Sequence, residues 1–251
     1  MATEEGGMGN PVVHFEINAP DEQLTAKFYS ELFGWHTEAM GEMSYVLVDT
    51  HSGGGINGGL GRTTDGTSVL FYVAVPDPQA TIDKAVSLGG EASTPVTEIP
   101  DVVTFASFRD PEGHEIGLVK DSTDEGPGVS AGANPQVGWF EIGCTDPKKM
   151  WDFYTSLFGW KINAGEGSDF VYGEVDTQAG HGIGGGIGSL PPGTPPYVTL
   201  YVDVDDVQKY LDRVEDLGGK TMVPPMQVHP SLEIAIFLDA QGVMLGLFHQ
   251  G

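Results

Sequence analysis

One segment of the chain occurs twice. Phe28–Trp35 reads FYSELFGW, and Phe153–Trp160 reads FYTSLFGW. The flanking motifs VDT, LGG and F-x-D also recur in the same order, with small insertions of the kind that loops tolerate. A chain of 251 residues can form two domains that each bury a core. The sequence therefore predicts a flexible N-terminus (1–11), a first domain (12–120), a polar linker (121–136) and a second domain (137–251).

Each half also reads as two smaller units in which a strand, a helix and further strands follow one another. Asp21 is suited to cap a helix that Gly34 ends, and Asp146 followed by a proline opens the matching helix of the second half. A further helix in each half begins near Asp77 or Val207 and ends at Leu-Gly-Gly. The strands are short apolar or alternating runs. We expect an α+β fold in which the order βαβββ occurs four times.

The charge balance limits the partners of the chain. It carries 36 acidic residues against 11 basic ones, a formal net charge of −25, and such a surface repels phosphate backbones. We therefore expect no nucleic-acid partner. No apolar run reaches the roughly 18 residues that a membrane span needs, and MATEEGGMGN lacks an apolar core, so a cytoplasmic location and no membrane partner are predicted. The single cysteine, Cys144, excludes an intrachain disulfide and Cys-rich zinc sites.

Motifs across both halves form a recognisable combination. A V-x-H-F-E-I strand precedes a helix ending F-Y-x-x-L-F-G-W, a Gly-rich hairpin, a strand and helix ending L-G-G, and a D-P-x-G-x-x-x-x-L strand. This combination resembles the vicinal oxygen chelate (VOC) superfamily of glyoxalases, bleomycin resistance proteins and extradiol dioxygenases, in particular its tandem-domain actinobacterial type labelled glyoxalase or hydroxylase. The resemblance implies that paired βαβββ modules form a curved mixed or antiparallel sheet cup, with helices outside. It also implies a lyase, isomerase or hydroxylase type of activity.

The resemblance further implies where metal ligands would stand, on the opening strand and as a carboxylate on the closing strand of each module. Catalytic zinc needs about three protein ligands, and non-haem iron typically needs two histidines and a carboxylate. His14 is the one residue at these places that is suited to bind a metal, so we expect no metal and no other cofactor. A divalent metal held by His14, Glu16 and Glu115 is the alternative. The places are His14, Phe71, Gly58 or Gly59, Gly117, Trp139, Leu200, Gly185 or Gly186, and Gly246.

Strand alternation suggests what lines the cups instead. Residues two apart in a strand share a face, so His14 brings Glu16 with it, and Trp139 brings Glu141. His14 and Glu16 are the candidate catalytic acid and base, because a desolvated carboxyl group beside a histidine can exchange protons. Alternatively, both glutamates lie on a solvated sheet face and Trp139 is a packed core residue. The candidate ligand-binding residues are Trp139, Glu141, Glu115, Phe71, Asn57 and Met244.

Other signals carry less chemistry. Both Gly-rich hairpins match G-x-G-x-x-G, but they lead into turns and not into the helix that a dinucleotide site requires. The remaining histidines lack partners at metal-ligand spacing, so exposed, loop or packing roles are expected for them. They are His36, His51, His114, His181, His229 and His249.

These observations predict a metal-independent VOC protein that binds or transforms a small, partly aromatic or hydrophobic metabolite. The alternatives are a metal-dependent enzyme of glyoxalase or dioxygenase type and a drug-sequestering resistance protein. Covalent duplication supplies both halves of a pseudo-dimer at high effective concentration, and both a monomeric pseudo-dimer and a homodimer remain open.

Overall fold

A computed structural model describes residues 9–41, 43–121, 129–165 and 171–251 of the chain. The predicted N-terminal segment 1–11 and linker 121–136 lie partly outside the described residues.

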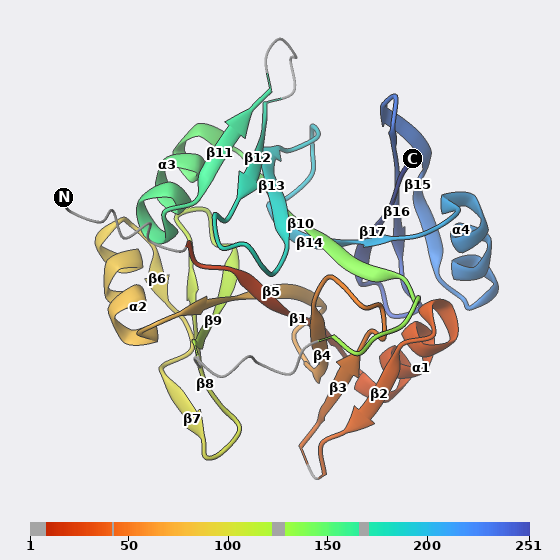
Figure 1. Cartoon of the computed structure of the whole chain (residues 1–251), viewed down its shortest axis with the longest axis horizontal. Coiled ribbons are helices and arrows are strands. Elements are labelled where there is room, and N and C mark those ends of the chain that lie inside the picture. Colours follow the sequence, from red (N-terminus) through yellow and green to blue (C-terminus); the bar gives the residue numbers. More distant parts are fainter. Residues whose placement is uncertain (1–8, 42, 122–128, 166–170) are drawn as a thin grey trace. The chain divides into compact units, whose positions relative to one another are not determined.

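Four modules follow one another along the chain (Figure 1). The first comprises β1 (Val12–Ala19), α1 (Glu22–Phe33), β2 (His36–Ala39), β3 (Tyr45–Asp49) and β4 (Asn57–Arg62). The second comprises β5 (Ser68–Val75), α2 (Pro78–Ser87), β6 (Glu91–Ala92), β7 (Thr97–Ile99), β8 (Val103–Arg109) and β9 (Glu115–Lys120). The third comprises β10 (Gln136–Cys144), α3 (Pro147–Phe158), β11 (Lys161–Ala164), β12 (Tyr172–Asp176) and β13 (Gly184–Ser189). The fourth comprises β14 (Tyr197–Asp203), α4 (Val207–Asp216), β15 (Lys220–His229), β16 (Leu232–Leu238) and β17 (Met244–Gln250).

The strands belong to two mixed sheets. One has the order β2-β3-β4-β1-β5-β9-β8-β6, with β7 paired to β8, and the other has the order β11-β12-β13-β10-β14-β17-β16-β15. Strands β1 and β4 are parallel, as are β14 and β17, whereas the hairpin neighbours β3–β4 and β16–β17 are antiparallel. The predicted α+β fold with repeated βαβββ modules is confirmed.

The chain forms two compact units, and each combines modules from both halves of the sequence. Unit 1 consists of Met1–Val13, Val73–Ser122 and Ile142–Tyr197. Unit 2 consists of His14–Tyr72, Thr123–Glu141 and Val198–Gly251. Helices α2 and α3 pack together within unit 1, and α1 packs with α4 within unit 2. The domain boundaries expected from the repeat stay a prediction.

The repeated segment FYSELFGW builds an aromatic cluster in unit 2. Helix α1 ends at Phe33 because Gly34 adopts a left-handed conformation with φ 76°, which favours glycine. The chain then turns back, and the Trp35 ring packs against Phe33 and Tyr29, with centroid separations of 4.8 and 5.7 Å. The indole nitrogen of Trp35 donates to the carbonyl of Pro135 at 2.8 Å. Each of these rings removes a large apolar surface from water.

Unit 1 contains the same cluster, built from the second copy of the segment. Gly159, with φ 74°, ends α3. The Trp160 ring packs against Phe158 at 4.8 Å and Tyr154 at 5.6 Å. Its indole nitrogen donates to the carbonyl of Asn10 at 2.7 Å. Each copy of the repeated segment therefore forms the aromatic cluster of one compact unit.

A buried tyrosine in each unit reaches from one module to an aspartate of the other. In unit 2, the Tyr29 hydroxyl of α1 donates to Asp239, which follows β16, at 3.2 Å. In unit 1, the Tyr154 hydroxyl of α3 donates to Asp110, which follows β8, at 2.8 Å. A carboxylate in a buried position is expensive unless donors satisfy it, so these pairs tie the two modules of a unit to one relative position.

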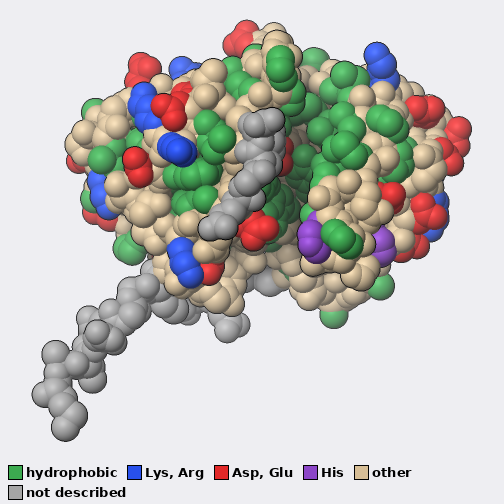
Figure 2. Space-filling view, turned by 90° about the horizontal axis from the view of Figure 1, so that it is seen from above, with side chains coloured by type: hydrophobic (Ala, Val, Ile, Leu, Met, Phe, Trp, Pro, Cys, Tyr) green, Lys and Arg blue, Asp and Glu red, His purple; other side chains and the backbone are tan. Residues whose placement is uncertain are grey.

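Acidic side chains do not gather into one patch on the face shown in Figure 2. On the face that Figure 2 presents, Asp and Glu side chains are dispersed among apolar and neutral ones. Within the described parts of the chain, no helix is long and apolar enough to span a membrane.

Removing one buried hydroxyl tests the tyrosine–aspartate contact. Tyr29→Phe leaves Asp239 buried without its side-chain donor, so the free energy of unfolding should fall by about 1–3 kcal/mol. Tyr210→Phe is the matched control, because among the described residues the buried Tyr210 makes ring contacts and no hydroxyl hydrogen bond. Urea unfolding measures both variants, and equal losses of stability would contradict the role given to the Tyr29 hydroxyl.

Candidate functional site

Strand β1 separates a packing face from a polar face. Phe15 and Ile17 are fully buried, whereas His14, Glu16 and Asn18 are half-buried and alternate with them. Successive side chains of a strand point to opposite faces, so the three polar residues share one face in unit 2. This face carries the two residues expected to act as acid and base.

Glu16 is held by hydrogen bonds from two side chains. Its Oε1 accepts from Asn18 Nδ2 at 2.9 Å, and its Oε2 accepts from the Tyr72 hydroxyl of β5 at 3.0 Å. The Tyr45 hydroxyl of β3 lies close enough to Glu16 for the carboxylate to raise the pKa of Tyr45. We call His14, Glu16, Asn18, Tyr45 and Tyr72 the His14 cluster.

His14 joins the cluster through Tyr45. Its Nε2 lies 3.2 Å from the Tyr45 hydroxyl oxygen, and its ring meets Tyr72 edge-on with a centroid separation of 5.6 Å. Burial lowers the pKa of His14 to about 4, so the imidazole is neutral at pH 7. Burial, followed by the nearby charge of Glu16, raises the pKa of Tyr45, so the phenol keeps its proton. In the contact between His14 and Tyr45, either the imidazole or the phenol can be the donor.

A glycine makes room for Tyr45. In the parallel pairing of β1 and β4, Gly59 lies opposite Glu16. A Cβ added to Gly59 would lie 2.0 Å from the Tyr45 hydroxyl oxygen, a separation that no real side chain tolerates. The phenol therefore occupies the space that any side chain of this strand position would take.

A tyrosine also covers a glycine at two positions of the second sheet. In unit 1, a Cβ on Gly186 of β13 would lie 1.8 Å from the Tyr172 hydroxyl oxygen. In unit 2, a Cβ on Gly246 of β17 would lie 2.2 Å from the Tyr201 ring. Tyrosines thus cover glycines at closing-strand positions of both sheets.

Two predicted ligand-binding residues of the first half lie outside the His14 cluster. Phe71 is fully buried and packs on Phe140 with a centroid separation of 4.4 Å. Because Tyr72 bonds to Glu16, alternation along β5 places Phe71 on the opposite face. The Asn57 side chain accepts from the amide and hydroxyl of Thr50 at 2.9 and 3.1 Å, so it closes the β3–β4 loop.

Three other predicted residues lie in the part of unit 2 that belongs to the second sheet. Glu141 accepts from the Tyr201 hydroxyl at 3.4 Å, and Trp139, two residues earlier on β10, is half-buried. Met244 is half-buried at the start of β17, and its carbonyl accepts from Thr199 at 2.8 Å. Tyr201 therefore contacts both Glu141 and the glycine that lies two residues after Met244.

Glu115 belongs to unit 1, and residues of its own module supply its hydrogen-bond donors and a nearby arginine. Its Oε1 accepts from the hydroxyls of Ser93 and Ser107 at 2.9 and 2.7 Å, and Arg109 lies 3.6 Å from its Oε2. This carboxylate is therefore fixed by three partners from the surrounding strands.

Sequence reasoning missed the tyrosines. Tyr45 opens YVLVDT and Tyr172 opens YGEVDT at matching positions of the repeat, and Tyr72 and Tyr201 match in FYVAV and LYVDV. The available signal was that these repeated tyrosines accompany repeated glycines on neighbouring strands. Throughout the described segments, no three or more His, Cys, Asp or Glu side chains are grouped to hold a metal ion.

Comparisons with known proteins agree with this fold. A family model described as Glyoxalase/Bleomycin resistance protein/Dioxygenase superfamily matches residues 136–247, and one described as Glyoxalase-like domain matches residues 14–119. The chain is 24% identical over 246 residues to "Putative glyoxylase CFP32" of Mycobacterium tuberculosis, covering 92% of each chain. It is 31% identical over 127 residues to the Anthracycline biosynthesis protein DnrV of Streptomyces peucetius, covering 45% of this chain and 46% of that one.

Solved structures show the same likeness in fold. The Mn(II)-bound glyoxalase from Novosphingobium aromaticivorans superposes with a TM-score of 0.69 at 16% identity, covering 96% of this chain and 82% of that one. The 2,2',3-trihydroxybiphenyl 1,2-dioxygenase of Sphingomonas wittichii superposes with a TM-score of 0.68 at 15% identity, covering 97% and 91%. With both halves matched by its family models, the chain belongs to the glyoxalase/bleomycin resistance protein/dioxygenase superfamily, the VOC superfamily.

Proposed function

We propose that the chain binds a small, partly aromatic organic molecule at the His14 cluster without an inner-sphere metal. The observation that carries this proposal is the position of Tyr45. Its phenol lies over Gly59, is hydrogen-bonded to His14 and lies beside Glu16, and these are the two side chains best suited to bind a metal. The cluster is therefore organised as a hydrogen-bonding surface.

The donor set does not fit the metal of the family. The family pattern needs a side chain on the closing strand, but Gly59 has none, and Tyr45 fills the space. His14 and Glu16 supply two donors of suitable type, fewer than the three or so that catalytic zinc or non-haem iron takes from the protein. Both donors are also engaged by tyrosine hydroxyls, whose bonds a metal would have to break.

The charges of unit 2 favour a neutral or cationic ligand. Its two arginines are held elsewhere, since Arg62 pairs with Glu22 at 2.6 Å and Arg213 donates to the Glu31 carbonyl. The cluster itself contributes one carboxylate and neutral groups. Glu16 and the formal net charge of −25 on the chain would repel an anionic ligand. A ligand with hydroxyl or amine groups could instead donate hydrogen bonds to the Glu16 carboxylate.

The rings of the cluster favour an aromatic ligand. An aromatic ligand could pack against the rings of His14 and Tyr72, which are already arranged edge-on to each other. The relative named for anthracycline biosynthesis supports the same class, because anthracyclines are hydroxylated aromatic compounds. The proposed ligand is therefore a hydroxylated or amino-substituted aromatic molecule.

Binding fits the cluster better than acid–base catalysis. An efficient general base has a pKa near the working pH, whereas burial lowers the pKa of His14 to about 4. A metal-dependent enzyme is the second candidate function, favoured by the likeness to a solved structure described as a Mn(II)-bound glyoxalase. Elemental analysis of the full chain, purified without chelators, separates the two, because stoichiometric metal that His14→Ala removes would establish the second.

Binding of test compounds checks the ligand class. We expect alizarin and catechol to bind, and benzoate to bind at least tenfold more weakly. Glu16→Gln and Tyr72→Phe should each weaken binding about 10-fold to 100-fold, the equivalent of roughly 1.5–3 kcal/mol for a charge-assisted hydrogen bond. Glu141→Gln and Tyr201→Phe are matched controls at the same repeat positions and should change affinity less than threefold. Calorimetric titration measures all five proteins, and preferred binding of benzoate would oppose the proposal.

The burial of His14 predicts how stability depends on pH. The folded-state pKa, about 4, lies below the ordinary value of 6.5, so the unfolded chain binds more protons between these values. The stabilising contribution is therefore complete above about pH 6.5 and is lost as the pH falls toward 4. His14→Gln should flatten this acid limb by up to about 1.4 kcal/mol per pH unit, whereas the exposed His36→Gln should not. Urea unfolding at several pH values measures the slopes, and identical slopes for wild type and His14→Gln would exclude this role.

A further inference from the structure

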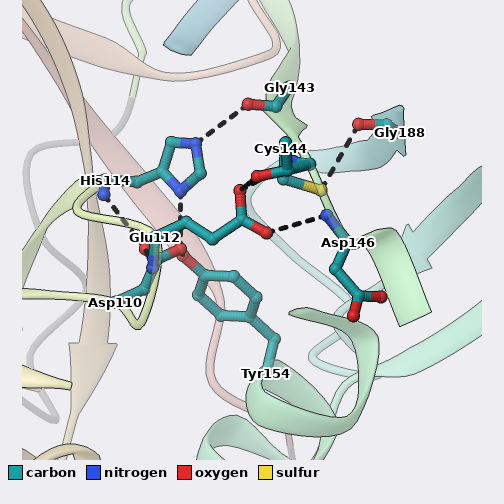
Figure 3. Close-up of polar contacts among 9 residues, drawn as sticks. Asp110, Glu112, His114, Gly143, Cys144, Asp146, Tyr154 and Gly188 are labelled. Carbon is teal, nitrogen blue, oxygen red and sulfur yellow. Dashed lines mark hydrogen bonds and ion pairs between the residues drawn. The ribbon is translucent and has the colours of Figure 1, made fainter. Parts of the chain in front are cut away.

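In unit 1, a buried side-chain pair fixes the turn between β8 and β9. The side chains of His114 and Asp110 are 2% and 0% exposed. His114 Nδ1 lies 2.7 Å from Asp110 Oδ2, and His114 Nε2 lies 2.9 Å from the carbonyl oxygen of Gly143 on β10 (Figure 3). Both ring nitrogens therefore face an acceptor.

The acceptors determine how many protons the imidazole needs. A carbonyl oxygen accepts only, and Asp110 already accepts from the Tyr154 hydroxyl at 2.8 Å and from the amides of Glu112 and His114 at 2.9 and 3.0 Å. In all of these contacts an Asp110 oxygen is the acceptor. A neutral imidazole has one N–H and would leave one buried acceptor facing a lone pair. An imidazolium satisfies both contacts.

We propose that His114 is a buried imidazolium that locks the β8–β9 turn of unit 1 to β10, and that its deprotonation loosens this turn while the equivalent turn of unit 2 stays closed. The lock is a pH-sensitive device separate from the His14 cluster. It does not depend on which ligand the chain binds.

The other titratable groups around His114 are neutral or negative. Glu112 on the turn accepts from the amide and hydroxyl of Thr145 and the amide of Asp146, where α3 is capped. Burial opposes its charge, but these bonds outweigh burial and lower the pKa of Glu112. Burial raises the pKa of Cys144 on β10 to about 12, and burial together with Asp110 raises that of Tyr154 on α3. The surroundings therefore offer His114 anions and no competing cation among these groups.

The direction of the pH dependence follows from this balance. Burial acts against a charged His114, but the hydrogen bond and charge of Asp110 and the bond to Gly143 outweigh it, so the pKa of His114 is raised above 6.5. A raised histidine pKa gives stability that is fully present below the unfolded value of about 6.5. This contribution is lost as the pH rises through the folded value, because the folded state then holds a proton that the unfolded state has released.

Unit 2 contains the same turn, but without a histidine at the position that corresponds to His114. Asp239 accepts from the Tyr29 hydroxyl and from the amides of Gln241 and Val243, as Asp110 does from its counterparts. Val243 stands in the place of His114. Gln241 stands in the place of Glu112 and bonds to Asp21. The turn therefore folds with valine at this position, and unit 2 is an internal control.

Loosening of the turn would affect both of its neighbours. A neutral imidazole keeps one of its two bonds, so either Asp110 or Gly143 loses a donor. The turn is followed directly by Glu115 of β9 and is tied through Glu112 to the start of α3. We therefore expect both segments to open more often at high pH.

Hydrogen exchange of the full chain between about pH 6 and pH 9 tests the proposal, after correction for the intrinsic pH dependence of exchange. Protection at residues 110–115 and 143–146 should fall by up to tenfold per pH unit until the folded pKa is passed. Residues 239–244 should not show this loss. His114→Val, which copies unit 2, should abolish the pH dependence in unit 1.

Three results would overturn the proposal: an equal loss in both units, no loss in the wild type, or a full loss retained in His114→Val. Nitrogen NMR of the wild-type histidines gives an independent readout if the variant folds poorly. One of the seven imidazoles should retain the signature of two N–H groups at about pH 7. A neutral signature for all seven would also overturn the proposal.

Discussion

The close approach of a tyrosine to a glycine determines the character of the candidate site. Because Gly59 has no side chain, Tyr45 reaches across β4 to form a hydrogen bond with His14, and its hydroxyl lies beside Glu16. Any larger residue at Gly59 would displace the phenol. The same arrangement at Gly186 and Gly246 makes it a property of the repeated module. The fold of the superfamily is retained, whereas the chemistry of this surface depends on phenols that replace a closing-strand side chain.

Duplication has allowed equivalent positions to acquire different chemistry. His14 on β1 corresponds to Trp139 on β10, so the two sheets present a polar and an aromatic residue at the same place. His114 corresponds to Val243, so one turn has a buried histidine–aspartate contact where the other has a buried valine. The aromatic clusters around Trp35 and Trp160 have not diverged in this way, because each compact unit needs its own core. The candidate site and the turns differ between the two halves, whereas the packing that joins the modules does not.

The fold was predictable from the sequence because its signals are local. Caps at Asp21 and Asp146, the stop at Gly34 and the repeat itself indicated the helices and their order. The parity of β1 likewise placed His14 and Glu16 on one face. The pairing of modules from different halves was not predictable, since it depends on contacts such as Tyr29 with Asp239 that no local pattern reveals. Tyr45 and His114 were missed for the same reason, because their partners are set by strand register and by distant modules.

In the function that we propose, Tyr45, and not a metal, organises His14 and Glu16. A crystal structure of the full chain soaked in manganese chloride, with anomalous data collected at the manganese edge, tests it most directly. We expect no anomalous peak within bonding distance of His14 or Glu16, and a Tyr45 hydroxyl that still lies over Gly59. A manganese ion bound to both side chains, with the Tyr45 ring rotated away, would contradict it.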